Sequence, residues 1–474
     1  MTYKIKQTEQ KALEINLDDK IYGTFSEVGA GQEVANNFFH VGASSGTIAK
    51  TMSAYDKTYS DAIYGIEESG RYVCESRLYK MLDHEYELLE ERLKVERPET
   101  CFFVFADTVS AINYHKSNKG HGWLGVRFQL DPNQEEPNEV IIHTKMLDND
   151  TRLQQEAIGL IGVNLLYACF KYHDKPQQLI CSLVDHIKDR VEVDMIRVKG
   201  PDFRYIDNRL MGLYLVKHRL TDVTMFDEAK NTIHASEFLY KKHLMVVRGH
   251  YQPPTIVSLD VLEKSLAQFK SENDVLGDKA IMLAELTLEN LEIDGEIDEF
   301  DFLSRADLLS AIGQKVMVTN CKNHQKLINY LSDYKIQNLG LVIGVRELHD
   351  IIAHKYEHNK DGRLLVAFGE LFTRNIKIYV YPALEDDQKT LMTASNLRVP
   401  EGIRFLYKHL LDSQQIVEVE NPNTDLLHIY PNSVHEAICK GDTGWEVLVP
   451  NELTDLILQN GMFCPIDKKP EATS

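Results

Sequence analysis

Short apolar runs alternate with helical segments through the second half of the chain. The runs are bounded by polar residues or glycines and cover residues 243–248, 280–288, 315–319, 340–344 and 376–381. Strands that alternate with helices at this spacing are typical of a parallel sheet covered by helices. The pattern therefore predicts an α/β protein whose C-terminal half is a parallel, Rossmann-like sheet with helices on both faces.

The first half of the chain has a less regular order of elements. Strands are predicted at residues 101–105, 123–130, 140–145 and 191–198, and helices at residues 71–95, 151–171 and 177–188. A glycine-rich segment near the start follows a short apolar strand from Ile21, and residues 32–40 and 47–64 are predicted to be helical. We therefore predict a mixed α+β N-terminal half.

A chain of 474 residues exceeds the size at which a single hydrophobic core usually stops growing. The change of pattern near residue 240 suggests a first boundary, and a mostly helical pattern follows residue 397. We predict three domains, which are residues 1–240 with the glycine-rich segment, residues 241–397 with the Rossmann-like sheet, and residues 398–474 as a C-terminal cap.

Charge and apolar content restrict the partners. The 72 acidic side chains outnumber the 52 basic ones and give a net charge of −20, which disfavours binding to nucleic acid or to a membrane surface. Residues 1–19 lack the apolar core of a signal peptide, and the longest apolar stretch, residues 157–170, is too short to span a bilayer. Seven scattered cysteines without a C-x-x-C pair favour reduced thiols. We expect a cytoplasmic protein.

Small residues are densest between residues 23 and 55. Glycines let backbone N–H groups converge on an anion, and a following helix and a lysine complete a phosphate site. The residues of this segment that would bind phosphate are Gly29, Gly31, Ser45, Gly46, Thr47 and Lys50. Neither the G-x-x-x-x-G-K-[ST] loop nor the G-x-G-x-x-G fingerprint is complete here. The alternative is a pair of tight turns whose small residues allow close helix packing.

A second segment, RGHYQPPT at residues 248–255, follows the first regular strand. It resembles the nucleotidyltransferase motif G-x-F-x-P-x-[HT]-x-G-H, but Val257 and Ser258 replace the motif's last glycine and histidine. The alternative is a proline-rich turn from strand to helix. Ligands of α/β folds bind beyond the carboxyl ends of strands, so Arg248 and Arg346, at the ends of two predicted strands, are expected to bind an anion.

Other patterns carry weaker chemical signals. Residues 354–358 match the H-x-x-E-H zinc signature, although turn residues follow and a surface helix end is the alternative. The acidic residues between 294 and 301 could hold Mg²⁺ beside a nucleotide, or form a solvated face. Asp107 is interpreted as a helix cap, and His121 could line a pocket. We assign no metal ligand and leave the cofactor open.

Most of the chain resembles an uncharacterised bacterial family. The stretches that carry the resemblance are IYGTFSEVGAGQEVANNFFHVGASSGTIAKTMSAYD, LDNDTRLQQEAIGLIGVNLLYA, DMIRVKGPDF, LMVVRGHYQPPT, GEIDEFDFLSRADLLSAIGQKV and FGELFTRNIKIYVYP. Members often carry automatic labels such as TonB-dependent receptor or nicotinamide mononucleotide (nicotinate-nucleotide) adenylyltransferase. The resemblance implies a cytoplasmic protein and transfers no catalytic residue.

The sequence therefore leaves two classes of function. In the first, the protein binds a nucleotide or another phosphorylated small molecule and is nucleotidyltransferase-like, with Ser45, Thr47 and Lys50 on one anion and Arg248 and Arg346 on another. In the second, it is a non-enzymatic scaffold or a self-assembling protein whose glycine-rich segment is structural. We expect a small phosphorylated partner and no nucleic acid or membrane partner, and leave open whether the chain forms a homo-oligomer. Whether the chain is an enzyme stays open.

Overall fold

A computed structural model describes residues 4–293, 295–359, 363–372, 376–385 and 387–463. The chain divides into two compact units, Met1–Thr224 and Met225–Ser474. They are called unit 1 and unit 2 below, and each is described by itself.

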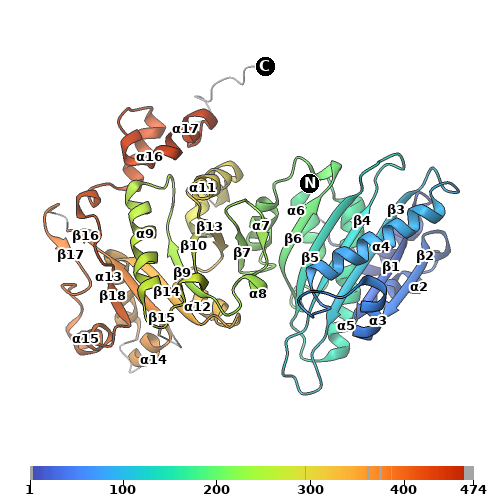
Figure 1. The fold of residues 1–474 in the computed structure, drawn as a ribbon, viewed down its shortest axis with the longest axis horizontal. Helices are drawn as coiled ribbons and strands as arrows, with labels where there is room; N and C mark the ends of the chain where they lie inside the picture. The colour runs from blue at the N-terminus through green and yellow to red at the C-terminus, as the bar shows by residue number, and fades with distance from the viewer. Residues whose placement is uncertain (1–3, 294, 360–362, 373–375, 386, 464–474) are drawn as a thin grey trace. The chain divides into compact units, whose positions relative to one another are not determined.

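Unit 1 is built on a six-stranded sheet in the order β2-β1-β3-β4-β5-β6 (Figure 1). Strand β1 pairs in parallel with both β2 and β3, and the remaining neighbours are antiparallel. The strands are β1 (Ile21–Gly29), β2 (Ile48–Ala54), β3 (Cys101–Ser110), β4 (His121–Phe128), β5 (Asn138–Met146) and β6 (Val191–Lys199). The predicted mixture of helices and strands is thus present, in a single mixed sheet.

Helices cover both faces of this sheet. One face packs on α1 (Thr8–Asn16), α2 (Val34–His40), α5 (Thr151–Lys171), α6 (Pro176–Leu183) and α7 (Asn208–Lys217). The other packs on α3 (Lys57–Tyr64) and α4 (Glu75–Leu93). Helix α5 is buried along most of its length, which explains why its sequence is apolar on all sides.

The prediction of a helix over residues 47–64 was wrong in its first part. Residues Ile48–Ala54 form the edge strand β2, and only Lys57–Tyr64 is helical. Side chains alternate between half-buried and exposed along β2, which is the period of a strand with one covered face. The local sequence of this segment fits either a helix or a strand, and pairing with β1 stabilises the strand.

Unit 2 contains most of an eight-stranded sheet in the order β18-β15-β14-β9-β10-β13-β7-β8. Each neighbouring pair from β18 through to β13 is parallel. The strands are β7 (Val223–Phe226), β8 (Thr232–Ile233), β9 (His243–Arg248), β10 (Ala280–Thr287), β13 (Lys315–Thr319), β14 (Asn338–Gly344), β15 (Ile376–Tyr381) and β18 (Ile416–Glu418). All five apolar runs predicted in this half form strands of the parallel set.

Alternate side chains of β15 show that helices lie on both faces of this sheet. Ile378 and Val380 join the core of α13 (Val345–His358), α14 (Leu364–Gly369) and α15 (Arg404–Asp412). Tyr379 and Tyr381 join the opposite core, which contains α9 (Ile256–Ser271). Two further helices connect strands, α11 (Glu299–Ala311) and α12 (His324–Ser332). The shorter elements are α8 (Ala235–Phe238), α10 (Leu288–Leu291), β11 (Glu292–Ile293), β12 (Glu296–Ile297), β16 (Ala383–Leu384) and β17 (Leu391–Met392).

The C-terminal part of the chain contributes to the sheet as well as covering it. Strand β18 pairs with β15, and α16 (Pro431–Lys440) and α17 (Asn451–Asn460) form an apolar cluster around Trp445. This cluster includes Leu308 of α11 and packs against Ile256 and Val257 in the first turn of α9. Among the helices that the structure describes, none has the length and apolarity needed to cross a membrane.

Candidate functional site

The order of the parallel strands in unit 2 reverses beside β9. The chain runs from β9 to β10 and β13 on one side, and then returns to form β14 on the other side. In open α/β sheets, ligands bind beyond the carboxyl ends of the two strands at such a reversal. The relevant ends are Arg248 on β9 and Gly344 on β14.

Arg248 is fixed at this edge by a buried carboxylate. Its Nε and Nη2 donate hydrogen bonds to the two carboxylate oxygens of Glu285, both at 2.9 Å, and Glu285 is fully buried on the neighbouring strand β10. The Thr319 hydroxyl donates to Glu285 at 2.7 Å, and Arg248 Nη2 also donates to the Cys321 carbonyl at 3.1 Å. The two-point ion pair fixes the plane of the guanidinium as well as its position.

One nitrogen of the Arg248 guanidinium remains available. Within the described part of the chain, no hydrogen-bond acceptor lies on Nη1, whereas Nε and Nη2 are both engaged. The Arg248 side chain is 12% exposed and Glu285 is not exposed. The arginine therefore presents a positively charged donor group at the strand end while its other nitrogens hold it in place.

His324 and Glu347 lie beside Arg248. Burial, helped by the neighbouring Arg248 charge, lowers the pKa of His324 to about 3, so this imidazole is neutral at pH 7. Its Nε2 is 3.8 Å from the Glu347 carboxylate at the start of α13. Partial burial raises the pKa of Glu347, and Arg248 opposes this effect. The Arg248 guanidinium thus lies beside a neutral imidazole and two carboxyl groups, those of Glu285 and Glu347.

The loop after β9 is held from α11. Arg305 donates to the backbone carbonyls of His250 at 3.1 Å and Asn290 at 2.9 Å. The Gln252 amide donates to Asp301 at 2.9 Å, and Asp301 also pairs with Arg305 at 2.6 Å. Burial, together with the Arg305 charge, lowers the pKa of His250. The loop is therefore preorganised, with a neutral imidazole beside the strand end.

The next residues of the loop serve the helix that follows. Thr255 caps α9 and forms a capping box with Ser258, while Val257 packs in the apolar cluster of α16 and α17. The two positions at which the sequence departs from the nucleotidyltransferase motif are thus used for capping and packing.

Arg346 lies at the same edge of the sheet, in the first turn of α13. Its Nη2 donates to the Leu384 carbonyl at 2.7 Å, and the residue is exposed. The carboxyl ends of the adjacent strands β9 and β14 therefore each carry an arginine, but the contacts of Arg248 and Arg346 are with different parts of unit 2.

The structure separates the glycine-rich residues of unit 1. Gly29 ends β1, and Gly31 follows it at the same carboxyl edge. Gly29 has a φ of +79°, and a Cβ atom there would lie 2.3 Å from the Val109 carbonyl oxygen. A Cβ atom on Gly31 would lie 2.0 Å from an oxygen of Asp107. Both glycines are thus required by close packing.

The other residues of the segment lie toward the opposite end of β1. Ser45 and Gly46 belong to an exposed 3₁₀ turn, and the Thr47 hydroxyl donates to the Asn16 carbonyl at 3.1 Å. Lys50, on β2, forms an ion pair with Glu85 of α4. Because Thr47 bonds to Gly23 near the start of β1, these residues are not brought together with Gly29 and Gly31 around one anion.

Two buried carboxyl groups lie at the Gly31 end of the sheet. Glu27 of β1 and Asp107 of β3 are directly opposite in register. Glu27 accepts the Val34 backbone N–H at 2.8 Å, whereas no hydrogen bond of normal geometry from the described residues reaches either oxygen of Asp107. Burial raises the pKa of Glu27 to about 7. Burial and the Glu27 charge raise the pKa of Asp107 well above its usual value.

The interpretation of Asp107 as a helix cap was therefore wrong. The residue is inside strand β3, which continues to Ser110, and its side chain is fully buried. No sequence pattern pointed to Glu27. The two residues are far apart in the sequence, and their proximity depends on the parallel pairing of β1 with β3.

The remaining sequence motifs are engaged in local contacts. His354 and His358 stack at a ring distance of 4.1 Å on α13, and His358 Nδ1 bonds to the His354 carbonyl at 2.9 Å. In the acidic segment, Asp298 caps α11 and Asp301 pairs with Arg305, while Asp294 lies outside the described residues. These contacts fit a surface helix and a capped helix.

Neither the family profiles nor the curated proteins include a match to this chain. Solved structures of competence and damage-inducible proteins show partial similarity. The CihA protein of Agrobacterium tumefaciens is 16% identical, with a TM-score of 0.26, over 35% of this chain and 98% of its own. A CinA superfamily protein of Klebsiella pneumoniae is 10% identical, with a TM-score of 0.25, over 34% of this chain and 96% of its own. A CinA superfamily protein of Escherichia coli is 12% identical, with a TM-score of 0.24, over 35% of this chain and 95% of its own.

Proposed function

We propose that unit 2 is a Rossmann-like domain of a cytoplasmic protein, and that it binds a nucleotide or another phosphorylated small molecule at the carboxyl ends of β9 and β14. The observation that carries the proposal is Arg248, held by Glu285 with Nη1 left as a donor at the strand-order reversal. A guanidinium fixed in this way suits a phosphate oxygen.

The loop between β9 and α9 supports the nucleotidyltransferase-like form of this proposal. The motif it resembles lies between a first parallel strand and the following helix, and residues 249–255 occupy that place. His250 provides an imidazole there, held through its carbonyl by Arg305. Mg²⁺ would accompany a nucleotide, and Glu347, whose partly exposed carboxylate is 3.8 Å from His324, is a candidate ligand.

The direct test is thermal unfolding of the purified full-length chain with a panel of nucleotides, dinucleotides and sugar phosphates, with and without Mg²⁺. A ligand at about 100 times its dissociation constant stabilises the native state by roughly 2.7 kcal/mol. Tryptophan fluorescence reports on the unfolding of each unit, because one of the two tryptophans, Trp123, lies in unit 1 and the other, Trp445, lies in unit 2. We expect a ligand-dependent shift in the transition of Trp445.

Arg248→Lys tests the site itself. Lysine keeps the positive charge opposite Glu285 but loses the fork of donors, and a hydrogen bond to a charged group contributes about 1.5–3 kcal/mol. The variant should therefore bind the ligand at least about tenfold more weakly. Lys270→Ala, at an exposed position in the last turn of α9, is the matched control and should bind normally.

Three results would contradict the proposal. They are the absence of any shift across the panel, a shift confined to the Trp123 transition, and wild-type affinity in Arg248→Lys. The first result would favour the scaffold or self-assembling class, which predicts that the chain forms homo-oligomers without a small ligand.

A further inference from the structure

Three neighbouring strands of unit 1 carry imidazole and carboxylate groups that the proposed site in unit 2 does not use. Trp123 of β4 lies opposite His143 of β5, and His121 lies opposite Lys145. Positions two apart on a strand share a face, so these four side chains lie on the same face of the sheet.

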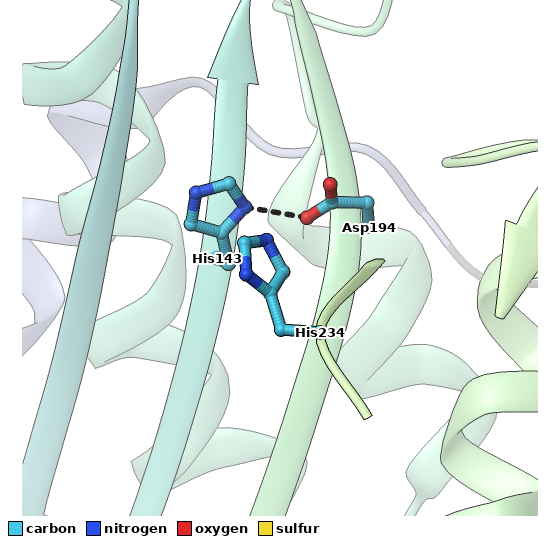
Figure 2. Close-up of side chains that lie close together, drawn as sticks. All are labelled: His143, Asp194 and His234. Carbon is cyan, nitrogen blue, oxygen red and sulfur yellow. Dashed lines mark hydrogen bonds and ion pairs between the residues drawn. The ribbon is translucent and has the colours of Figure 1, made fainter. Parts of the chain in front are cut away.

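The adjoining strand supplies the carboxylate through an irregularity. His143 is paired with Met195 of β6, and Thr144 is paired with Val193, so the register shifts around Asp194. A bulge of this kind adds one residue to a strand and redirects its side chain. Asp194 is consequently aimed at His143 of the neighbouring strand, at a distance of 2.6 Å from Asp194 Oδ1 to His143 Nδ1 (Figure 2).

The second nitrogen of His143 faces another imidazole. His143 Nε2 is 3.1 Å from His121 Nδ1, and the Trp123 ring packs against His143 with a centroid distance of 4.9 Å. Lys145 forms an ion pair with the other oxygen of Asp194 at 3.0 Å. When His143 donates its Nδ1–H to Asp194, its Nε2 accepts, and His121 Nδ1–H is the donor of the contact between the two rings. A cation replaces this hydrogen bond when His121 carries its proton on Nε2 instead, because both facing nitrogens then offer a lone pair.

We propose that His121 Nδ1 and His143 Nε2 together bind one divalent transition-metal cation, with Asp194 as the carboxylate that orients His143. A cation 2.0–2.1 Å from both nitrogens would have an N–metal–N angle of about 100° at the observed spacing, between the octahedral and tetrahedral values. Histidine ligands of metals usually donate their other N–H to a carboxylate in this way.

The ligand chemistry restricts the metal. Imidazole nitrogens suit Zn²⁺, Co²⁺, Ni²⁺ and Cu²⁺, whereas Mg²⁺ and Ca²⁺ prefer oxygen ligands. Two protein nitrogens leave further coordination positions for water or for a ligand atom. This site lies within unit 1 and uses none of the residues of the proposed nucleotide site.

The test is titration of the full-length apo-protein with Co²⁺ and Zn²⁺, followed by visible Co²⁺ absorption and by calorimetry. We expect one saturable site without thiolate-to-cobalt charge transfer, because the proposed ligands are nitrogens. His121→Phe keeps a ring against His143 while removing the nitrogen, and should abolish that site. Asp194→Asn should weaken it about 10- to 100-fold, the usual effect of removing an outer carboxylate.

Two histidine variants serve as controls. His115→Ala changes an exposed loop histidine of unit 1, and His354→Ala breaks the stacked pair on α13. Both should bind cobalt as the wild type does, and circular dichroism should show that His121→Phe is folded. Wild-type binding by a folded His121→Phe, loss of the site in His354→Ala, or no saturable binding by the wild type would each overturn the proposal.

Discussion

The buried pair Glu27 and Asp107 makes the stability of unit 1 depend on pH. Both carboxyl groups have raised pKa values in the folded protein, so the native state retains protons that the unfolded chain releases. Well below pH 3.8, the ordinary pKa of an aspartic acid, the pair costs no stability, because both carboxyl groups are protonated in the folded and the unfolded state. As the pH rises through the folded pKa values, the unfolded state is increasingly favoured. Unit 1 should therefore be less stable at pH 8 than at pH 5.

The size of the effect follows from Glu27. Its pKa rises from the ordinary value of 4.5 to about 7 in the folded protein, and one pKa unit corresponds to about 1.36 kcal/mol. Glu27 alone should thus lower the free energy of unfolding by about 3 kcal/mol, most of it lost between pH 4.5 and 7. Asp107 acts in the same direction, because its carboxyl group is fully buried.

Urea unfolding at a series of pH values measures this loss. A Trp445→Phe background leaves Trp123 of unit 1 as the fluorescent tryptophan. In that background, Glu27→Gln keeps an oxygen for the Val34 N–H, and Asp107→Asn removes the charge that has no normal hydrogen bond among the described residues. Each variant should show a smaller loss of stability from pH 5 to pH 8 than the parent.

Glu91→Gln provides the matched control, because Glu91 is exposed on α4. Its unfolding free energy should follow the pH dependence of the parent protein. The role assigned to the buried pair is refuted if Glu27→Gln and Asp107→Asn both keep the parent's pH dependence, or if the parent gains stability between pH 5 and pH 8.

Packing gives two further predictions. Gly31→Ala should destabilise unit 1 by at least about 1–3 kcal/mol, because its Cβ would overlap a buried carboxylate, whereas Gly46→Ala has open space around its Cβ and should be close to neutral in the same urea assay. Leu453→Ala, at a fully buried position in the cluster of α16 and α17, should cost about 2–5 kcal/mol in unit 2. Leu458→Ala, on the same helix but 57% exposed, should change the Trp445 transition little.

The parallel sheet of unit 2 could be predicted because its strands are locally encoded. Each of its five main strands is a short apolar run between helical segments, as expected where both faces of a sheet are buried. Strand β18 was missed, because Ile416–Glu418 has only three residues and its structure depends on pairing with β15. Local pattern therefore predicted the centre of the sheet but not its edge.

The chemical groups were harder to predict, because they are assembled by strand pairing. The position of Arg248 at a strand end could be read from the sequence, but its partner Glu285 is 37 residues away in a run that reads as core. The segment between residues 23 and 55 looked like one site because its small residues are close in sequence. In the structure, β1 separates Gly29 and Gly31 from the Ser45 turn.

The pair of Arg248 and Glu285 is better explained by positioning than by stability. A buried ion pair gains little over apolar side chains of similar volume, since both charges must leave water. Here the carboxylate also accepts the Thr319 hydroxyl, and the guanidinium also donates to the Cys321 carbonyl. These bonds fix the arginine in one orientation and leave Nη1 without a partner among the described residues. Such an arrangement is expected where a cation must stay in place at the edge of a sheet and still offer a donor to a ligand.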